Sequence, residues 1–192
     1  MHKLSRQDLF GLEQYAEMRA AFRDEVMKHK RDRQFSIGEH VRLCFEDRTT
    51  IQYQIQEMLR IERIFEAAAI EEELSAYNPL IPEGRNLKAT MLIEYVDVEE
   101  RRAALERLVR IEDTIWLAVD DDRVTAVANE DMDRSRENKT AAVHFLRFEL
   151  SDEQVAAMRA GTRVSAGSDH HAYRLELGLP AAVVTAICKD FD

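Results

Sequence analysis

Apolar residues near the start of the chain repeat with the period of an α-helix. They recur at helical spacing as far as about residue 30: Leu12, Tyr15, Phe22 and Val26. Ser5, with Asp8 three residues later, has the form of a capping box at a helix start. The pattern predicts an N-terminal amphipathic helix from residue 5 to about Lys30, polar outside and packed by its apolar side on the protein or on a second copy.

From residue 34 the period changes to two. Apolar residues alternate with polar ones over 41–46 and again over 51–56, on either side of the polar stretch 47–49. This predicts a β-hairpin. The second run also suits a helix, because Ile51, Ile55, Met58 and Leu59 recur at helical spacing. We expect a strand to about Ile55, followed by a helix from Gln56 to about Tyr77.

Two prolines then interrupt the pattern. Pro79 and Pro82 lie in the segment 78–84, which must end the preceding helix because proline lacks the backbone N–H and restricts the residue before it. We place the one candidate boundary here, between a helix–hairpin–helix portion over 1–84 and an α+β portion over 85–192. We expect the two portions to form one compact unit.

The second half alternates between short strands and helices. The predicted elements are a strand over 87–95, a helix over 98–108, a hairpin from 115–119 and 124–128, a strand over 142–150, a helix opened by the capping box Ser151–Gln154, strands over 163–166 and 173–177, and a last helix with Pro180 at its first position. Hairpins mixed with helices predict an α+β fold, in which helices cover a mixed or mostly antiparallel sheet.

Composition and charge narrow the class of protein. The chain has 192 residues, 45 % of them hydrophobic, so it can bury a sizeable core. Its net charge of −10 argues against nucleic acid as a partner, because binding to phosphates needs a basic surface. Cys44 and Cys188 are the only cysteines, and no apolar run has the length of a membrane span or a signal peptide. We expect a cytoplasmic protein that does not enter the membrane.

Common catalytic signatures are missing from the sequence. It contains neither a glycine-rich phosphate loop nor a GxSxG or HExxH motif, and it has no Glu-x-x-His pair of the kind that builds di-iron bundles. The sequence therefore leaves open whether the protein is an enzyme and names no cofactor.

A few polar residues are expected where polarity is costly. Glu62 is flanked by Leu59, Phe65 and Ala69 and so projects from the apolar stripe of the predicted helix 56–77. There a carboxylate pairs with an arginine, serves as a metal ligand or general acid–base group, or is simply exposed. Glu57, with Arg60 beside it, is a weaker candidate on the neighbouring side. His144 shares a strand face with Leu146 and Phe148, either as a hydrogen-bonded core residue or as a ligand.

Two more places on the chain have ligand-type side chains. Arg147 lies on the opposite face of the strand from His144, where it can pair with a carboxylate, and Lys139 precedes this strand either as a plain strand start or facing an anion. His170 and His171 follow Asp169 in a predicted turn. They are either a polar turn or two metal ligands, with His144 or Glu62 as a third.

Four stretches of the chain resemble the signature segments of a bacterial domain-of-unknown-function family. These are residues 53–62, 77–82, 86–90 and 139–146, and the resemblance extends over nearly the whole chain. It carries no established activity and no functional residues. It does imply genes that neighbour those of a rubrerythrin-like protein and an iron–sulfur oxidoreductase, and hence such proteins as partners.

Three functions follow as hypotheses. The first is a non-enzymatic accessory protein of a cytoplasmic redox or peroxide-defence system, which acts through protein contacts and forms a homodimer or other homo-oligomer. The second is a metal-binding protein or metal-dependent enzyme that uses Glu and His ligands. The third is a small-molecule-binding module with a pocket between the sheet and the helix 56–77.

Overall fold

Two antiparallel sheets form the body of the protein. The computed structural model describes residues 1–130, 134–135 and 138–192. The first sheet has the strand order β1 (Gln34–Ile37), β2 (Val41–Phe45), β3 (Asn86–Ile93), β7 (Val143–Glu149) and β6 (Val127–Ala128). The second has the order β5 (Asp122–Thr125), β4 (Ile115–Val119), β8 (Val164–His170) and β9 (Tyr173–Gly178). Every strand pair is antiparallel, so the predicted α+β class is confirmed.

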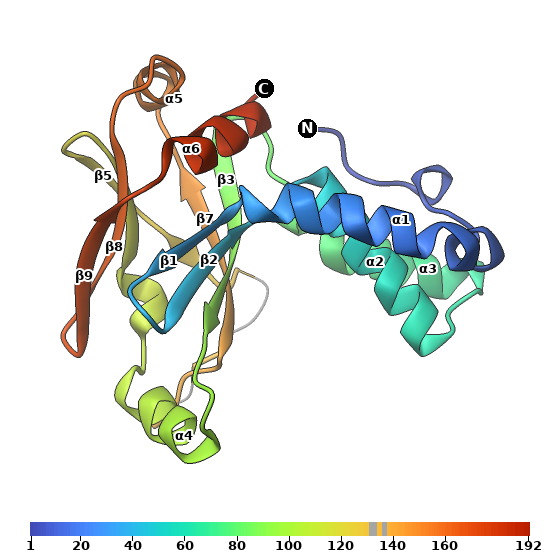
Figure 1. Cartoon of the computed structure of the whole chain (residues 1–192), viewed down its shortest axis with the longest axis horizontal. Coiled ribbons are helices and arrows are strands. Elements are labelled where there is room, and N and C mark those ends of the chain that lie inside the picture. The colour runs from blue at the N-terminus through green and yellow to red at the C-terminus, as the bar shows by residue number, and fades with distance from the viewer. Residues whose placement is uncertain (131–133, 136–137) are drawn as a thin grey trace.

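The main core lies between the two sheets and buries side chains of both. It includes Leu43 of β2, Met91 of β3, Phe148 of β7, Leu117 of β4 and Ala166 of β8. Helices α5 (Asp152–Arg159) and α6 (Ala181–Ile187) lie at one end of the sheets, and α4 (Val98–Arg107) lies at the other (Figure 1). Short 3-10 turns at Ile111–Thr114 and Cys188–Asp190 complete this part of the chain.

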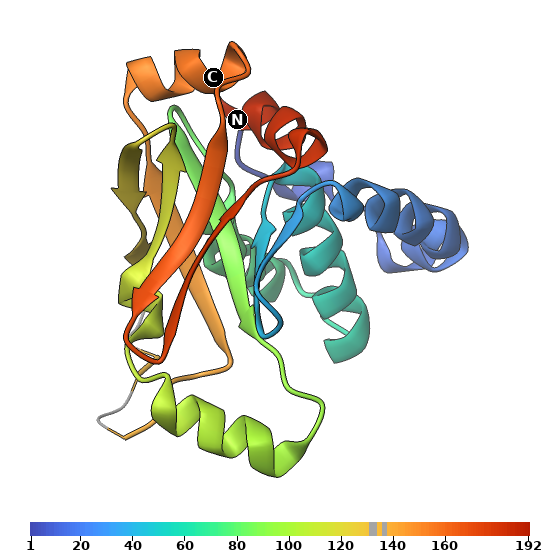
Figure 2. The same cartoon turned by 60° about the vertical axis from the view of Figure 1, so that its left-hand side comes forward.

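A separate helical layer stands outside the first sheet. Helices α1 (Leu12–Arg31), α2 (Arg48–Glu62) and α3 (Ala67–Tyr77) project away from the strands (Figures 1 and 2). Their own apolar cluster contains Leu4, Ile51, Ile55, Leu59, Leu74 and Ile81. The 3-10 turns Arg6–Asp8 and Asn78–Leu80 close it at its edges. No helix within the described residues combines the length and the apolar composition that a membrane crossing requires.

The prediction of a strand over residues 51–55 is wrong. This run belongs to α2, because Asp47 caps a helix at this point. The Thr50 N–H donates to Asp47 Oδ1 at 2.9 Å, and the Asp47 N–H donates to Thr50 Oγ1 at 2.9 Å. The hairpin is formed instead by β1 and β2, so the run 41–46 is its second strand and not its first. Its turn includes Gly38, whose φ of +71° suits glycine.

Three predicted helix boundaries also differ. Arg63 adopts a left-handed conformation with φ 56°, so the helix expected over 56–77 is instead the end of α2 followed by α3. The Ser5–Asp8 capping box caps a 3-10 turn, and α1 begins at Leu12. Pro180 occupies the N-cap of α6, one position before the first helical residue. Residues with capping or turn chemistry stop a helix even where the apolar pattern continues.

Most of the second half matches its prediction. The strand near 87–95, the helix near 98–108, the strand near 142–150 and the helix behind the Ser151–Gln154 capping box are all present. The predicted strand over 124–128 is divided, since β5 pairs with β4 while β6 pairs with β7 of the other sheet. The division of the chain at residue 84 stays a prediction. The β2–β3 ladder joins strands from the two sides of that point.

A buried ion pair joins the helical layer to the end of the chain. Arg33, directly after α1, is 2 % exposed and forms an ion pair with Asp190, which is 1 % exposed. The same guanidinium donates to the carbonyl oxygens of Phe45, Glu46 and Ala186. Asp47 lies 3.5 Å from it and also pairs with His29 at 2.5 Å. One arginine therefore connects α1, the end of β2 and α6.

Candidate functional site

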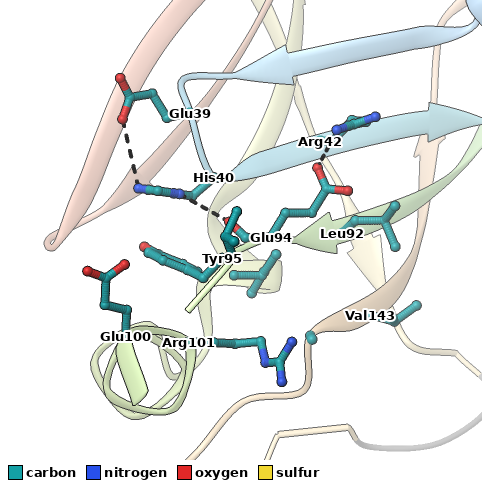
Figure 3. Close-up of a pocket in the computed structure, with 12 residues that line it drawn as sticks. Glu39, His40, Arg42, Leu92, Glu94, Tyr95, Glu100, Arg101 and Val143 are labelled. Carbon is teal, nitrogen blue, oxygen red and sulfur yellow. Dashed lines mark hydrogen bonds and ion pairs between the residues drawn. The ribbon is translucent and has the colours of Figure 1, made fainter. Parts of the chain in front are cut away.

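A wide cleft opens between the β1–β2 hairpin and the start of α4. Its volume is about 770 Å³. The ends of β2, β3 and β7 form its floor, and the first turn of α4 forms one wall (Figure 3). The cleft is therefore assembled from segments that are distant in sequence.

Two stacked rings form the aromatic side of the cleft. The His40 ring lies on Tyr95 with centroids 3.9 Å apart and planes 15° apart. His40 Nδ1 donates to the backbone oxygen of Glu94 at 3.1 Å, which fixes the orientation of the ring. Tyr173 holds the hairpin tip in place, because its hydroxyl donates to Ile37 O at 2.6 Å and accepts from the His40 N–H at 3.1 Å.

Charges of both signs line the same cleft. Arg42 and Glu94 form an ion pair at 2.6 Å. Arg101 extends from α4 toward the strand ends (Figure 3), is partly buried, and forms no ion pair with any residue that the structure describes. Glu39 is 92 % exposed, and Glu100 is also exposed. Among the described residues, the cleft can therefore offer an unpaired guanidinium and exposed carboxylates to a ligand.

Apolar surface continues from the floor to the rim. Leu92 and Val143 contribute to the floor, and the Val143 residue is 40 % exposed. Val96 and Val98, at the entrance to α4, are 103 % and 60 % exposed. Exposed aliphatic residues that adjoin a cleft are typical of surfaces that contact another molecule.

Glu62 does not project from an apolar stripe, and this prediction is wrong. It is the last residue of α2 and is exposed. The left-handed turn at Arg63 ends the helix before Phe65 and Ala69, two of the residues that defined the expected stripe. Phe65 itself is 69 % exposed.

Glu57 is the carboxylate of this segment that has arginine partners. It accepts two hydrogen bonds from Arg19 of α1, at 2.8 Å each, and one from the Tyr15 hydroxyl at 2.8 Å. Arg60 contacts it at 3.4 Å. The hydrogen bonds from Arg19 lower the pKa of Glu57 to about 2. The cluster therefore joins α1 to α2 through a carboxylate that stays ionised.

Replacing Glu57 by glutamine should destabilise the protein by about 1–2 kcal/mol, since a charge-assisted contact of a mostly covered carboxylate is lost. Because the pKa of Glu57 is depressed when folded, its contribution is present above the unfolded value of 4.5 and is lost as the pH falls toward 2. Urea unfolding of both proteins between neutral and acidic pH measures this. A difference in stability that is the same at every pH would contradict the assignment.

His144 is a hydrogen-bonded core residue, the first of its two predicted alternatives. It is fully buried on the face that it shares with Leu146 and Phe148. Its Nε2 donates to Ala141 O at 2.9 Å, and its Nδ1 accepts from the Asn129 amide at 2.9 Å. Burial lowers its pKa, so the imidazole stays neutral.

A buried hydroxyl–carboxylate network continues from His144. Thr140 Oγ1 lies 2.9 Å from His144 Nε2 and donates to Glu112 Oε2 at 3.2 Å. Ser135 also hydrogen-bonds to Glu112. Since Glu112 is 1 % exposed, these hydroxyls supply the hydrogen bonds that a buried carboxylate requires. The network fixes the chain segment ahead of β7.

The rings of His170 and His171 lie side by side, with centroids 4.4 Å apart, but no third ligand joins them within the described residues. His170 is buried, donates from Nε2 to Val109 O at 3.1 Å and has its pKa lowered by burial, whereas His171 is exposed. Across the described part of the chain, no three His, Cys, Asp or Glu side chains are placed to hold one metal ion. Glu62, His144, His170 and His171 therefore do not form the shared site considered above.

The remaining predicted residues lie on the surface of β7 and before it. Arg147 pairs with Glu130 at 2.9 Å and with Glu149 at 2.9 Å, so its carboxylate partners come from strands and loops and not from a buried helix position. Lys139 is exposed, ahead of β7. Neither residue lines the cleft.

Sequence reasoning missed the residues of the cleft. His40, Tyr95 and Arg101 belong to no motif and lie on three different segments. One signal in the sequence could have indicated the cleft. Val96 and Val98 stand directly before a highly charged helix, where no predicted core needs apolar residues.

Comparisons with known proteins agree with the resemblance noted in the sequence. The family described as "Protein of unknown function (DUF3501)" matches residues 3–191. A crystal structure described as a novel protein of unknown function from Burkholderia pseudomallei is 49 % identical, covers 100 % of both chains and has a TM-score of 0.95. No curated protein matches. The chain belongs to the DUF3501 family of proteins of unknown function.

Proposed function

We propose that the protein is an interaction module that receives a short segment of a partner protein in the cleft between the β1–β2 hairpin and α4. The observation that carries this proposal is the position of Arg101, a partly buried guanidinium without an ion pair among the described residues, beside exposed carboxylates and exposed aliphatic residues. The segment we expect has an acidic residue for Arg101, an aliphatic residue for the floor and a basic residue for Glu39 or Glu100.

The mixed charge of the cleft supports a polypeptide ligand. A simple anion would be repelled by Glu39 and Glu100, and a simple cation by Arg101, because Arg42 and Glu94 neutralise each other. A peptide presents both signs a few ångströms apart, so it can satisfy both sets of groups. Complementary charges of this kind fix the register and the choice of partner more than they add affinity.

The apolar rim supports a macromolecule over a small ligand. Val96 lines the open rim of the cleft and Val98 begins α4, and both are exposed to solvent. A small molecule seated on the floor would leave them in water, whereas a protein would cover them and remove apolar surface from solvent. The stacked His40 and Tyr95 rings provide a rigid surface of the type enriched at interfaces.

The class of partner is the one that the family resemblance implies. We expect a cytoplasmic rubrerythrin-like or iron–sulfur protein, and a role for this chain as a non-enzymatic accessory of a redox or peroxide-defence system. Purified candidates of both classes can be titrated against the protein, with the variants below as controls.

Replacing Arg101 by glutamate should weaken selective peptide binding. We would select a displayed random linear-peptide library on the wild-type protein and measure the affinity of the enriched peptides. Loss of one charge-assisted hydrogen bond costs about 1.5–3 kcal/mol, so binding should weaken roughly tenfold or more. The matched control is Arg102→Glu, one residue along α4, where Arg102 is exposed and paired with Glu106.

Three outcomes decide the proposal. Enriched peptides that contain an acidic–aliphatic–basic pattern, and that Arg101→Glu rejects while Arg102→Glu accepts, support it. Peptides that bind both variants equally would place the interaction elsewhere. Stabilisation by free amino acids in a thermal-shift assay, with no peptide enriched, would replace the partner protein by a small zwitterion.

A further inference from the structure

Strand β9 is an unpartnered edge of the second sheet. Within the described residues it forms a ladder only with β8, from His170↔Tyr173 to Ser165↔Gly178. The backbone N–H and C=O groups along its other side therefore have no strand partner. The nearby hairpin tip contacts the first half of β9 through side chains: the Tyr173 hydroxyl donates to Ile37 O, and the Leu175 side chain packs against Gly38.

The side chains of β9 are exposed on both faces of the sheet. Leu175 and Leu177 are 39 % and 41 % exposed, although Leu177 lies opposite Ala166 of the core. Arg174 and Glu176 occupy the other face. β9 contains no proline and no lysine, two of the devices that protect natural edge strands from pairing.

We propose that β9 pairs with β9 of a second copy of the chain, antiparallel and about a two-fold axis through Leu175. The two four-stranded sheets then form one continuous sheet. Leu175 lies opposite Leu175 of the second copy, and Arg174 lies opposite Glu176 of the second copy on both sides of the axis. This inference is independent of the cleft and of its proposed partner.

Charge selects this register among the alternatives. Directly opposed residues of an antiparallel pair lie close enough to interact, so opposite charges stabilise the pair and like charges destabilise it. If the two strands are shifted by two residues in one direction, Arg174 lies opposite Arg174 of the second copy. If they are shifted in the other direction, Glu176 lies opposite Glu176. A shift by one residue places leucine opposite a charged residue and exchanges the faces of the sheet.

The charged side chains of β9 are exposed enough to form these pairs. Arg174 is exposed and has no ion pair among the described residues. Glu176 already contacts Arg123 at 3.2 Å and Arg163 at 4.0 Å, and its side chain stays 45 % exposed, so a further guanidinium can approach. A ladder of one six-residue strand buries little surface, so we expect a concentration-dependent dimer and not an obligate one.

Sedimentation of the wild-type chain and of two charge-reversal variants tests the proposal. In Arg174→Glu, each of the two 174–176 pairs across the interface consists of two carboxylates. In Glu176→Arg, each of these pairs consists of two guanidinium groups. Each variant alone should dimerise roughly tenfold more weakly or worse than the wild type. An equimolar mixture of the two should recover the dimer, because every opposed pair then has opposite charges.

Recovery on mixing separates the interface from a folding defect. Thermal melts of the single variants show whether either is unfolded, and Arg102→Glu on α4 serves as a charge control far from β9. A wild-type chain that stays monomeric at all concentrations would overturn the proposal. So would a dimer that both single variants retain, or a mixture that fails to associate.

Discussion

Replacing Arg33 by methionine is expected to lower the free energy of unfolding by about 3–5 kcal/mol, the cost of removing one partner of a buried ion pair. Methionine retains much of the apolar volume but none of the five donors of the guanidinium. Asp190 then loses its ion pair, and the carbonyl oxygens of Phe45, Glu46 and Ala186 each lose a donor.

The size of this effect should depend on pH. Burial already raises the pKa of Asp190 to about 6, against an ordinary value of 3.8. An acid whose pKa is higher in the folded state binds protons more strongly when folded, so its charge opposes stability as the pH rises through this range. Without Arg33 the pKa rises further. The stability deficit of the variant should therefore be largest near neutral pH and should shrink as the pH falls below 6.

Urea unfolding of Arg33→Met at several pH values measures both effects. Arg102→Met, an exposed position on α4, is the control and should change stability by less than about 0.5 kcal/mol. A small loss that stays constant with pH would contradict the view that Asp190 is held ionised in the core by Arg33.

Replacing Gly167 by alanine is the second large effect that we expect. A Cβ at this position of β8 would lie 2.3 Å from Trp116 Cζ2 and 2.4 Å from the backbone oxygen of Leu175. The indole has no room to withdraw, because it is 3 % exposed and the Arg123 guanidinium lies 3.8 Å above its ring. The strands themselves must separate, which should cost about 3 kcal/mol.

Gly178→Ala in β9 is the matched control. No atom lies within 4 Å of a Cβ built at Gly178, and its backbone is outside the left-handed region. We expect a change close to zero or slightly stabilising, because alanine restricts the unfolded chain. The comparison uses thermal melts with Trp116, the one tryptophan of the chain, as the fluorescent probe. Equal behaviour of the two variants would contradict the close packing of β8 on the indole.

The sequence alone predicted the elements whose signals are local. The capping box at Ser151, the prolines after Tyr77 and the alternation over 142–150 each act within a few residues, so their outcome hardly depends on distant contacts. The α+β class and the inward face of His144 follow from such signals. The exposure of Glu62 does not follow from such signals. It depends on the left-handed conformation of Arg63, which the apolar periodicity of the neighbouring residues does not indicate.

Tertiary structure decided the rest. The run 51–55 suits a strand and a helix equally by pattern, and the Asp47 cap together with the apolar cluster around Ile51 and Ile55 makes it a helix. The cleft depends on three segments that meet only after β2, β3 and α4 are packed, so no spacing in the sequence brings His40, Tyr95 and Arg101 together. Local chemistry fixes where elements begin and end, whereas the packing of those elements determines which side chains share a surface.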